Sequence, residues 1–166
     1  MSKLSAYNQA FENAELSHPP VHARMEASDW RRHFLNLKNG AILAETDTGT
    51  LHFWSEDRSV YRRFETAAPI DPDLRPGLSA KVMRKVVGPK WRPTPEMLEV
   101  DPTLPRVVKA GPDNPLGTHA LYLSWKADGI HGTSDQDIPT GGIALDNAQM
   151  AELFELARVG TQVKLV

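Results

Sequence analysis

Cysteine is absent from this chain of 166 residues. Its absence excludes disulfide bonds, thiolate metal sites and a cysteine nucleophile. Because no cysteine is present, cysteine usage gives no information on whether the protein works in an oxidising or a reducing compartment. An excess of charge of either sign is also missing, because 19 Lys and Arg residues stand against 21 Asp and Glu residues, for a formal net charge of −2. A nearly neutral chain offers no basic field to nucleic acid or to an anionic membrane surface, so both kinds of partner are disfavoured.

Long apolar runs are absent as well, and no segment has the roughly 20 apolar residues that a membrane-spanning helix needs. Residues 1–10 carry no basic stretch followed by an apolar one, which is the pattern of a secretory signal peptide. As the sequence stands we expect a cytoplasmic protein without a membrane span. If a signal peptide has been removed, we expect the periplasm or the cell envelope. The length predicts one domain with its own core.

Residues 1–38 differ in character from residues 39–166. The first stretch contains one weak amphipathic stripe at helical spacing, formed by Leu4, Tyr7, Phe11 and Ala14. The pair of prolines at 19 and 20 ends any helix there. We interpret residues 1–38 as an N-terminal arm, partly helical or disordered, because chain termini are usually poorly ordered. A helix that binds a partner is the second interpretation.

From Ala41 onward the pattern is that of a mainly β protein. Alternating apolar residues bounded by turn signals predict strands at Ile42–Thr46, Leu51–Ser55, Val60–Thr66, Ser79–Val87, Ala120–Trp125, Gly129–His131 and Gln162–Val166. Prolines interrupt residues 90–115, so this stretch is expected to be extended, apart from a helical turn at Pro95–Leu98.

One longer helix is expected near the C-terminus. Asp146 and Gln149 have the spacing of a capping box, which marks a helix start. Apolar residues then recur on one face, and Gly160 ends the helix; the face consists of Met150, Leu153, Phe154 and Ala157.

Four motifs follow one another along the chain. They are Pro93-Thr94-Pro95-Glu96-Met97, Gly111-Pro112-Asp113-Asn114-Pro115-Leu116-Gly117, His131-Gly132-Thr133 and Thr140-Gly141-Gly142-Ile143-Ala144-Leu145. In this order they resemble landmarks of the L,D-transpeptidase (YkuD) family, which includes the ErfK, YbiS, YcfS and YnhG proteins. The resemblance covers residues 39–166 as one L,D-transpeptidase-like domain. It implies a YkuD-like β-sandwich with one helix near the C-terminus, and a peptidoglycan stem peptide as the substrate.

The resemblance also shows what this chain has lost. The family's motif reads Ser-Gly-Cys-Ile-Arg-Leu, so Thr140 matches the serine, Gly142 the nucleophilic cysteine and Ala144 the arginine. Glycine has no side-chain atom that can attack a carbonyl group, so covalent catalysis by the family mechanism is excluded at this position. The 11 positions from His131 to Gly142 are also fewer than the family pattern carries, which predicts a shortened loop.

His131 has a catalytic and a structural interpretation. The resemblance implies a role in activating the cysteine, but a partly buried histidine more often bonds to a backbone carbonyl group or a nearby hydroxyl such as that of Thr133, and we favour the structural interpretation. The candidate ligand-binding residues are His131, Thr133, Ser134, Trp91 and His119. No histidine and carboxylate residues stand at metal-ligand spacing on a firm element, so neither a metal ion nor a cofactor is expected.

Three functional hypotheses remain open. The preferred one is a catalytically inactive L,D-transpeptidase-like domain, a pseudoenzyme, that binds peptidoglycan stem peptides or a partner protein. The alternative is an enzyme of altered chemistry, a transferase or hydrolase in which His131 activates a hydroxyl group or water. The third is a structural module whose N-terminal arm makes the contacts. The oligomeric state does not follow from the sequence.

Overall fold

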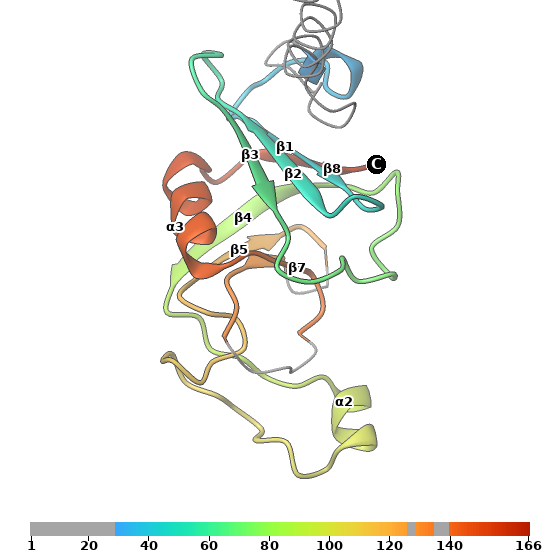
Figure 1. Cartoon of the computed structure of the whole chain (residues 1–166), viewed down its shortest axis with the longest axis vertical. Helices are drawn as coiled ribbons and strands as arrows, with labels where there is room; N and C mark the ends of the chain where they lie inside the picture. Colours follow the sequence, from blue (N-terminus) through green and yellow to red (C-terminus); the bar gives the residue numbers. More distant parts are fainter. Residues whose placement is uncertain (1–28, 126–128, 135–139) are drawn as a thin grey trace, which may run out of the picture.

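The structure is a computed structural model, and it describes residues 29–125, 129–134 and 140–166 (Figure 1). The apolar stripe expected between Leu4 and Ala14 lies outside the described residues. The elements are, in chain order, a 3-10 helix η2 (Asp29–Arg32), β1 (Ala41–Glu45), β2 (Thr50–Trp54), β3 (Tyr61–Glu65), β4 (Ser79–Val87), α2 (Pro95–Val100), β5 (His119–Leu123), β6 (Ile130–His131), β7 (Ile143–Ala144), α3 (Asn147–Leu156) and β8 (Gln162–Leu165).

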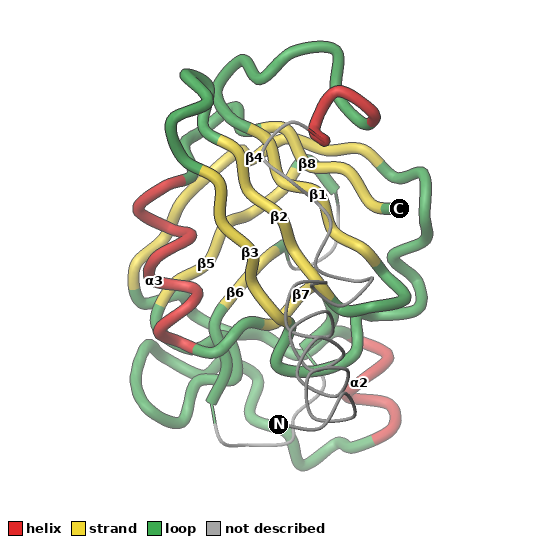
Figure 2. The backbone as a smooth tube through the Cα atoms, turned by 45° about the horizontal axis from the view of Figure 1, so that its top comes forward, coloured by secondary structure: helices red, strands yellow, loops and turns green. Residues whose placement is uncertain are grey.

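The strands form one sheet in the order β3-β2-β1-β8-β4-β5-β6-β7, and the expected mainly β fold is confirmed. β4 belongs to two halves of this sheet, because its first residues pair with β8 and its later ones with β5. The sheet curls until its two ends meet at a bridge between Thr66, which follows β3, and Leu145, which follows β7. Figure 2 shows the strands wrapped around the centre of the molecule, with α3 along one side.

The core lies between the curled sheet and α3. Leu121 and Ile130 of the sheet and Leu153 of α3 are all 0% exposed. A fully buried Leu or Ile side chain stabilises the fold by roughly 1.5–3 kcal/mol relative to exposure. In a second buried cluster, side chains from residues 29–38 pack against β1 and β2. Its members are Trp30, Phe34, Leu37, Ala41, Leu43 and Trp54. The described end of the arm is therefore packed on the domain.

The predicted helix start and the first hairpin are both present. The Asp146 side chain accepts a hydrogen bond of 2.8 Å from the Gln149 backbone N–H, and the Gln149 side-chain amide donates to the same carboxylate. These hydrogen bonds, the backbone one first, lower the pKa of Asp146. β1 and β2 pair from Ala41 to Glu45 across a turn that contains Gly49 at φ 65°.

Residues 88–118 form a long excursion away from the sheet, which Figure 1 shows below the strands with α2 at its far end. The predicted helical turn is present as α2, and the Thr94 hydroxyl caps it by accepting from the Met97 N–H at 3.3 Å. Among the described helices none is long and apolar enough to cross a membrane.

Candidate functional site around His131

A row of paired residues crosses four strands and contains His131. Val86 pairs with Ala120, Ala120 with His131, and His131 with Ala144. Side chains of directly paired residues point to the same face of a sheet, and successive residues alternate between the faces. The neighbours Leu121, Ile130 and Ile143 belong to the core that α3 covers. The row therefore lies on the other face of the sheet, away from α3.

The His131 side chain is 1% exposed and is bonded at both ring nitrogens. Nδ1 lies 2.5 Å from the Gly132 carbonyl oxygen, and Nε2 lies 3.0 Å from the Gly141 carbonyl oxygen and 3.1 Å from Thr140 Oγ1. A carbonyl oxygen only accepts, so Nδ1 carries a proton in this arrangement. When the ring is neutral, Nε2 accepts from the Thr140 hydroxyl; when both nitrogens are protonated, Nε2 donates to the Gly141 carbonyl oxygen.

The loop that approaches His131 depends on two consecutive glycines. Gly141 and Gly142 have φ values of 71° and 72°, in the left-handed region. The chain returns to extended structure directly afterwards, because Ile143 N–H donates to the Gly129 carbonyl oxygen and Leu145 N–H to that of His131, at 3.0 and 2.9 Å. An L-residue with a Cβ atom adopts the left-handed conformation at a cost of roughly 1–2 kcal/mol. The local backbone thus selects glycine at both positions.

Gly132 also has a structural reason to be glycine. A Cβ atom there would lie 2.3 Å from Asn147 Oδ1 and 3.3 Å from the Gly117 Cα. The same Asn147 oxygen accepts a hydrogen bond of 3.1 Å from the Thr118 backbone N–H. Because Gly132 has no Cβ atom, the Asn147 side chain at the start of α3 can come close enough to bond to Thr118, which directly precedes β5.

The remaining candidate residues do not all gather at His131. Thr133 follows Gly132, and its hydroxyl donates to the Ser134 carbonyl oxygen at 3.0 Å, so it does not bond to the His131 ring. Ser134 is half-buried beside it. His119 precedes Ala120 on β5 and so faces the α3 side, where its ring centroid lies 4.7 Å from that of Phe154. These two faces of the sheet separate His119 from His131.

Trp91 is 1% exposed and bridges Val108 within the excursion, so its ring belongs to the packing there and does not face solvent. The residue that holds the excursion in place is Asn114, which is fully buried. Its amide nitrogen donates to the carbonyl oxygens of Pro89, Val108 and Lys109 at 2.7, 3.2 and 3.0 Å, and its oxygen accepts from the Leu116 N–H at 2.8 Å. Sequence reasoning noticed the motif that contains Asn114 but not this role.

An irregularity in β4 directs further side chains to the His131 face. Val82 pairs with Leu123 and lies in the core, whereas Arg84 pairs with Tyr122, so the register shifts between them. Without the shift, Val82 and Arg84 would share a face; with it, Arg84 faces the same side as His131. A groove of about 530 Å³ opens here, lined by Arg84, Val86, Gly88, Lys90, Arg92, Leu116 and Tyr122. Nothing in the sequence pattern indicated this groove.

In the described part of the chain, no group of three or more His, Cys, Asp or Glu side chains could hold a metal ion. The described side chains at the site offer hydrogen bonding and proton exchange at His131 and Thr140, and the neighbouring groove adds positive charge.

Comparison with known sequences identifies the family. The family model for the YkuD L,D-transpeptidase catalytic domain matches residues 39–165. A putative L,D-transpeptidase of Fuscovulum blasticum is 42% identical over 142 residues, which are 82% of this chain and 75% of that protein. The probable L,D-transpeptidase YbiS of Escherichia coli K12 is 39% identical over 97 residues, which are 53% of this chain and 31% of that protein. The chain thus matches less than a third of the YbiS length.

Solved structures share the fold. An L,D-transpeptidase from Mycobacterium smegmatis superposes with a TM-score of 0.52 at 17% identity, over 77% of this chain and 58% of that chain. The Enterococcus faecium L,D-transpeptidase catalytic domain acylated by ertapenem gives a TM-score of 0.51 at 16% identity, over 77% of this chain and 97% of that chain. The sequence match, the curled β fold and the motif order agree, and the chain belongs to the YkuD family of L,D-transpeptidase catalytic domains.

Proposed function

We propose that this protein is a catalytically silent L,D-transpeptidase domain that recognises peptidoglycan stem peptides at the sheet face around His131. The observation that carries the proposal is the bonding of the His131 ring. Its Nε2 atom meets the Gly141 carbonyl oxygen at 3.0 Å and the Thr140 hydroxyl at 3.1 Å. No thiol is present in the chain for this nitrogen to activate.

The family reaction needs a thiolate that attacks the peptide carbonyl and leaves a thioester. Gly142, at the matching position, offers no atom for this bond. Its left-handed backbone, with φ 72°, further indicates that the loop is built around glycine and not around a displaced nucleophile. A preserved scaffold without its reactive atom supports a role in binding.

Stem peptides are the ligands we favour, because family membership supplies the relation to peptidoglycan and the groove beside His131 supplies a hollow of suitable size. We place this activity in the cell envelope, where peptidoglycan is found. A partner protein is the second occupant of the same face, and the test below separates the two.

Mass spectrometry tests whether the protein is catalytically inactive. Purified protein is incubated with tetrapeptide-bearing muropeptides, and separately with a carbapenem. We expect unchanged muropeptides and an unaltered protein mass, because no side chain can hold the acyl group as a thioester. Transfer, cleavage or an acylated protein would contradict the proposal. Binding of the muropeptides is measured on the same samples by calorimetry, and its absence would favour a partner protein as the occupant.

A second candidate function rests on one distance. The Thr140 hydroxyl lies 3.1 Å from His131 Nε2, which is within reach of a general base, and the Gly132 carbonyl oxygen orients the ring through Nδ1. In this alternative Thr140 Oγ1 attacks a peptide carbonyl and its proton passes to Nε2. The C–N bond then breaks, Nε2 returns the proton to the departing amine, and an ester remains on Thr140. The same hydroxyl lies 3.2 Å from the Gly141 carbonyl oxygen, which competes with Nε2 as the acceptor of its proton.

Two variants distinguish this alternative. Thr140→Ser keeps a hydroxyl group and Thr140→Val removes it at nearly constant shape. Turnover that survives in Thr140→Ser and disappears in Thr140→Val would establish hydroxyl chemistry. Equal inactivity of wild type and both variants supports the silent domain.

A further inference from the structure

Three positively charged side chains line the groove beside His131. Arg84 comes from β4, and Lys90 and Arg92 come from the start of the excursion; all three line the hollow of about 530 Å³ together with the Tyr122 ring. No acidic residue is among the lining side chains. This concentration of charge is local, because the chain as a whole has a formal net charge of −2.

These three cations differ from the arginines that have an acidic partner. Arg62 pairs with Glu152 at 2.9 Å, and Arg158 with Glu56 at 3.4 Å. Within the described residues, Arg84, Lys90 and Arg92 make no ion pair. Like charges that gather around one hollow without an acidic partner repel one another, and an anionic ligand would relieve that repulsion.

The Arg84 guanidinium stacks on an aromatic ring. It lies over the Tyr122 ring, 4.4 Å from the ring centroid, and such stacking leaves the edge donors of the group free. A guanidinium held in this way can donate two parallel hydrogen bonds to a carboxylate. The bulge in β4 is what places this group on the His131 face, and bulges frequently redirect side chains beside functional sites.

The groove wall and His131 belong to one row of paired residues on the same face of the sheet, in which Ala120 and His131 are buried. Val86 lines the groove, pairs with Ala120, and Ala120 pairs with His131. Adjacent strands lie roughly 4.8 Å apart, so two strand spacings, on the order of 10 Å, separate the groove wall from His131. A peptide of three or four residues spans this distance with ease.

We propose that the Arg84–Lys90–Arg92 groove is the carboxylate-binding part of the peptide site, and that it recognises a short peptide with several free carboxylates whose remaining part extends toward His131. The inference rests on the proposed function and adds the groups that select the ligand. A hollow of about 530 Å³ suits a small peptide better than a single inorganic anion.

Calorimetry on the full chain tests the inference with two matched probes. One is a stem tetrapeptide with free carboxylates, and the other is the same peptide with its carboxylates amidated. We expect wild type to bind the free form at least about tenfold more tightly, and this preference to shrink as salt is raised. In the double variant Arg84→Gln with Arg92→Gln, the preference should fall to about twofold or less.

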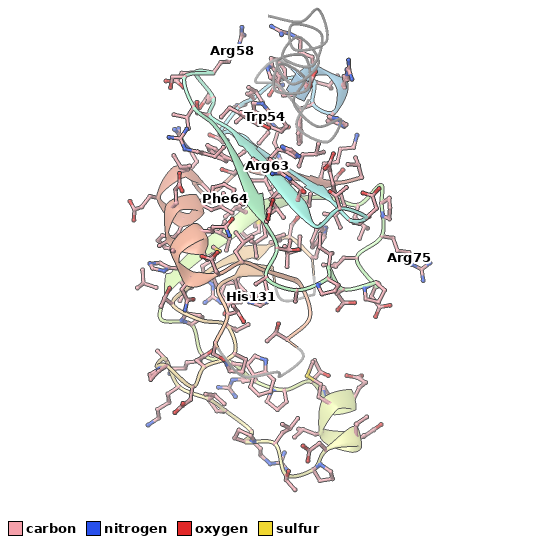
Figure 3. The ribbon with its side chains drawn as sticks, viewed as in Figure 1. Trp54, Arg58, Arg63, Phe64, Arg75 and His131 are labelled. Carbon is pink, nitrogen blue, oxygen red and sulfur yellow. The ribbon has the colours of Figure 1, made fainter. Side chains whose placement is uncertain are left out.

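Two controls test whether the loss of preference is specific to the groove and whether the variants are folded. Arg75→Gln removes one positive charge from an exposed residue that Figure 3 shows pointing away from the body of the molecule, so the preference should be retained. Circular dichroism of all variants confirms that they fold; if the double variant does not fold, Lys90→Gln alone takes its place, with a smaller loss expected. Inorganic phosphate serves as a competitor.

The outcomes separate the two proposals. If wild type binds both peptides equally, stem-peptide recognition stands and the carboxylate site is wrong. If wild type binds neither peptide, the proposed function fails and the present inference fails with it. If millimolar phosphate displaces the free peptide completely while the amidated form still binds, the groove is a general anion site and the peptide-specific inference is overturned.

Discussion

The substitution Gly142→Cys would return a thiol to the position that the family motif gives to the nucleophile, and we expect the variant to stay inactive. Gly142 is buried and has a φ of 72°. An L-residue in this conformation costs roughly 1–2 kcal/mol. In a domain of this size each kcal/mol lowers the melting temperature by about 2–4 °C, so we expect a loss of about 2–8 °C.

The thiol would also lack a free base. The His131 Nδ1 atom is held by the Gly132 carbonyl oxygen at 2.5 Å, and Nε2 by the Gly141 carbonyl oxygen at 3.0 Å and the Thr140 hydroxyl at 3.1 Å. The new side chain would have to displace one of the Nε2 contacts. A misplacement of about 1 Å can lower a rate by about a hundredfold, so we expect no measurable muropeptide turnover.

The assay combines three readings on Gly142→Cys: the melting temperature, the pH dependence of thiol alkylation, and the protein mass after incubation with a carbapenem. Gly142→Ala is the matched control, since it adds the same Cβ atom without the thiol. We expect both variants to lose similar stability, and the thiol to alkylate as an ordinary cysteine, without carbapenem adduct. Rapid acylation, or an alanine variant as stable as wild type, would refute the reasoning.

The remaining predictions concern stability. Gly132→Ala should destabilise the protein by about 1–3 kcal/mol in urea unfolding, because its Cβ would lie 2.3 Å from Asn147 Oδ1. Asn114→Ala should cost about 2–4 kcal/mol by the same measurement, since it leaves buried carbonyl oxygens without a donor. Burial lowers the pKa of His52 below its ordinary value of 6.5, so the unfolded state takes up the proton first as the pH falls. Wild type should therefore lose stability between pH 7 and 5 more steeply than His52→Gln, as thermal melts at each pH would show; parallel slopes would contradict the assignment.

Much of the fold followed from the local pattern. The strands of the first hairpin alternate in hydrophobicity around a glycine turn, and the Asp146 cap precedes a face that contains Met150 and Leu153. Such signals are local, because a turn or a cap is decided by residues a few positions apart. They are present in the structure at nearly the predicted positions.

What the sequence did not reveal depends on contacts between distant residues. The register shift in β4 arises from its pairing with β5, and it moves Arg84 away from the face that Val82 occupies. Trp91 looked available to a ligand among its prolines, yet the bridge to Val108 buries it. The side-chain periodicity of one strand does not show where its pairing with a distant strand contains a bulge, so the basic groove is recognisable only in the structure.

The His131 site was predicted in part for the same reason. The motif identified the residue, and a carbonyl partner was expected for a partly buried histidine. The two carbonyl oxygens that meet its nitrogens belong to Gly132 and Gly141, and the second is nearby only because β6 and β7 pair in parallel. The positive φ of Gly142 likewise depends on the path that the loop takes between His131 and β7, and the residue types of the loop alone do not predict it.

The central claim is that the protein binds a stem peptide without converting it, and one NMR titration tests both halves. Isotope-labelled protein is titrated with a tetrapeptide-bearing muropeptide while the signals of protein and ligand are followed together. The account predicts saturable amide shifts at His131, Thr133 and Thr140, with the ligand's own covalent structure unchanged over a day. Absence of shifts at these residues, or the growth of cleaved or cross-linked product signals, would contradict it.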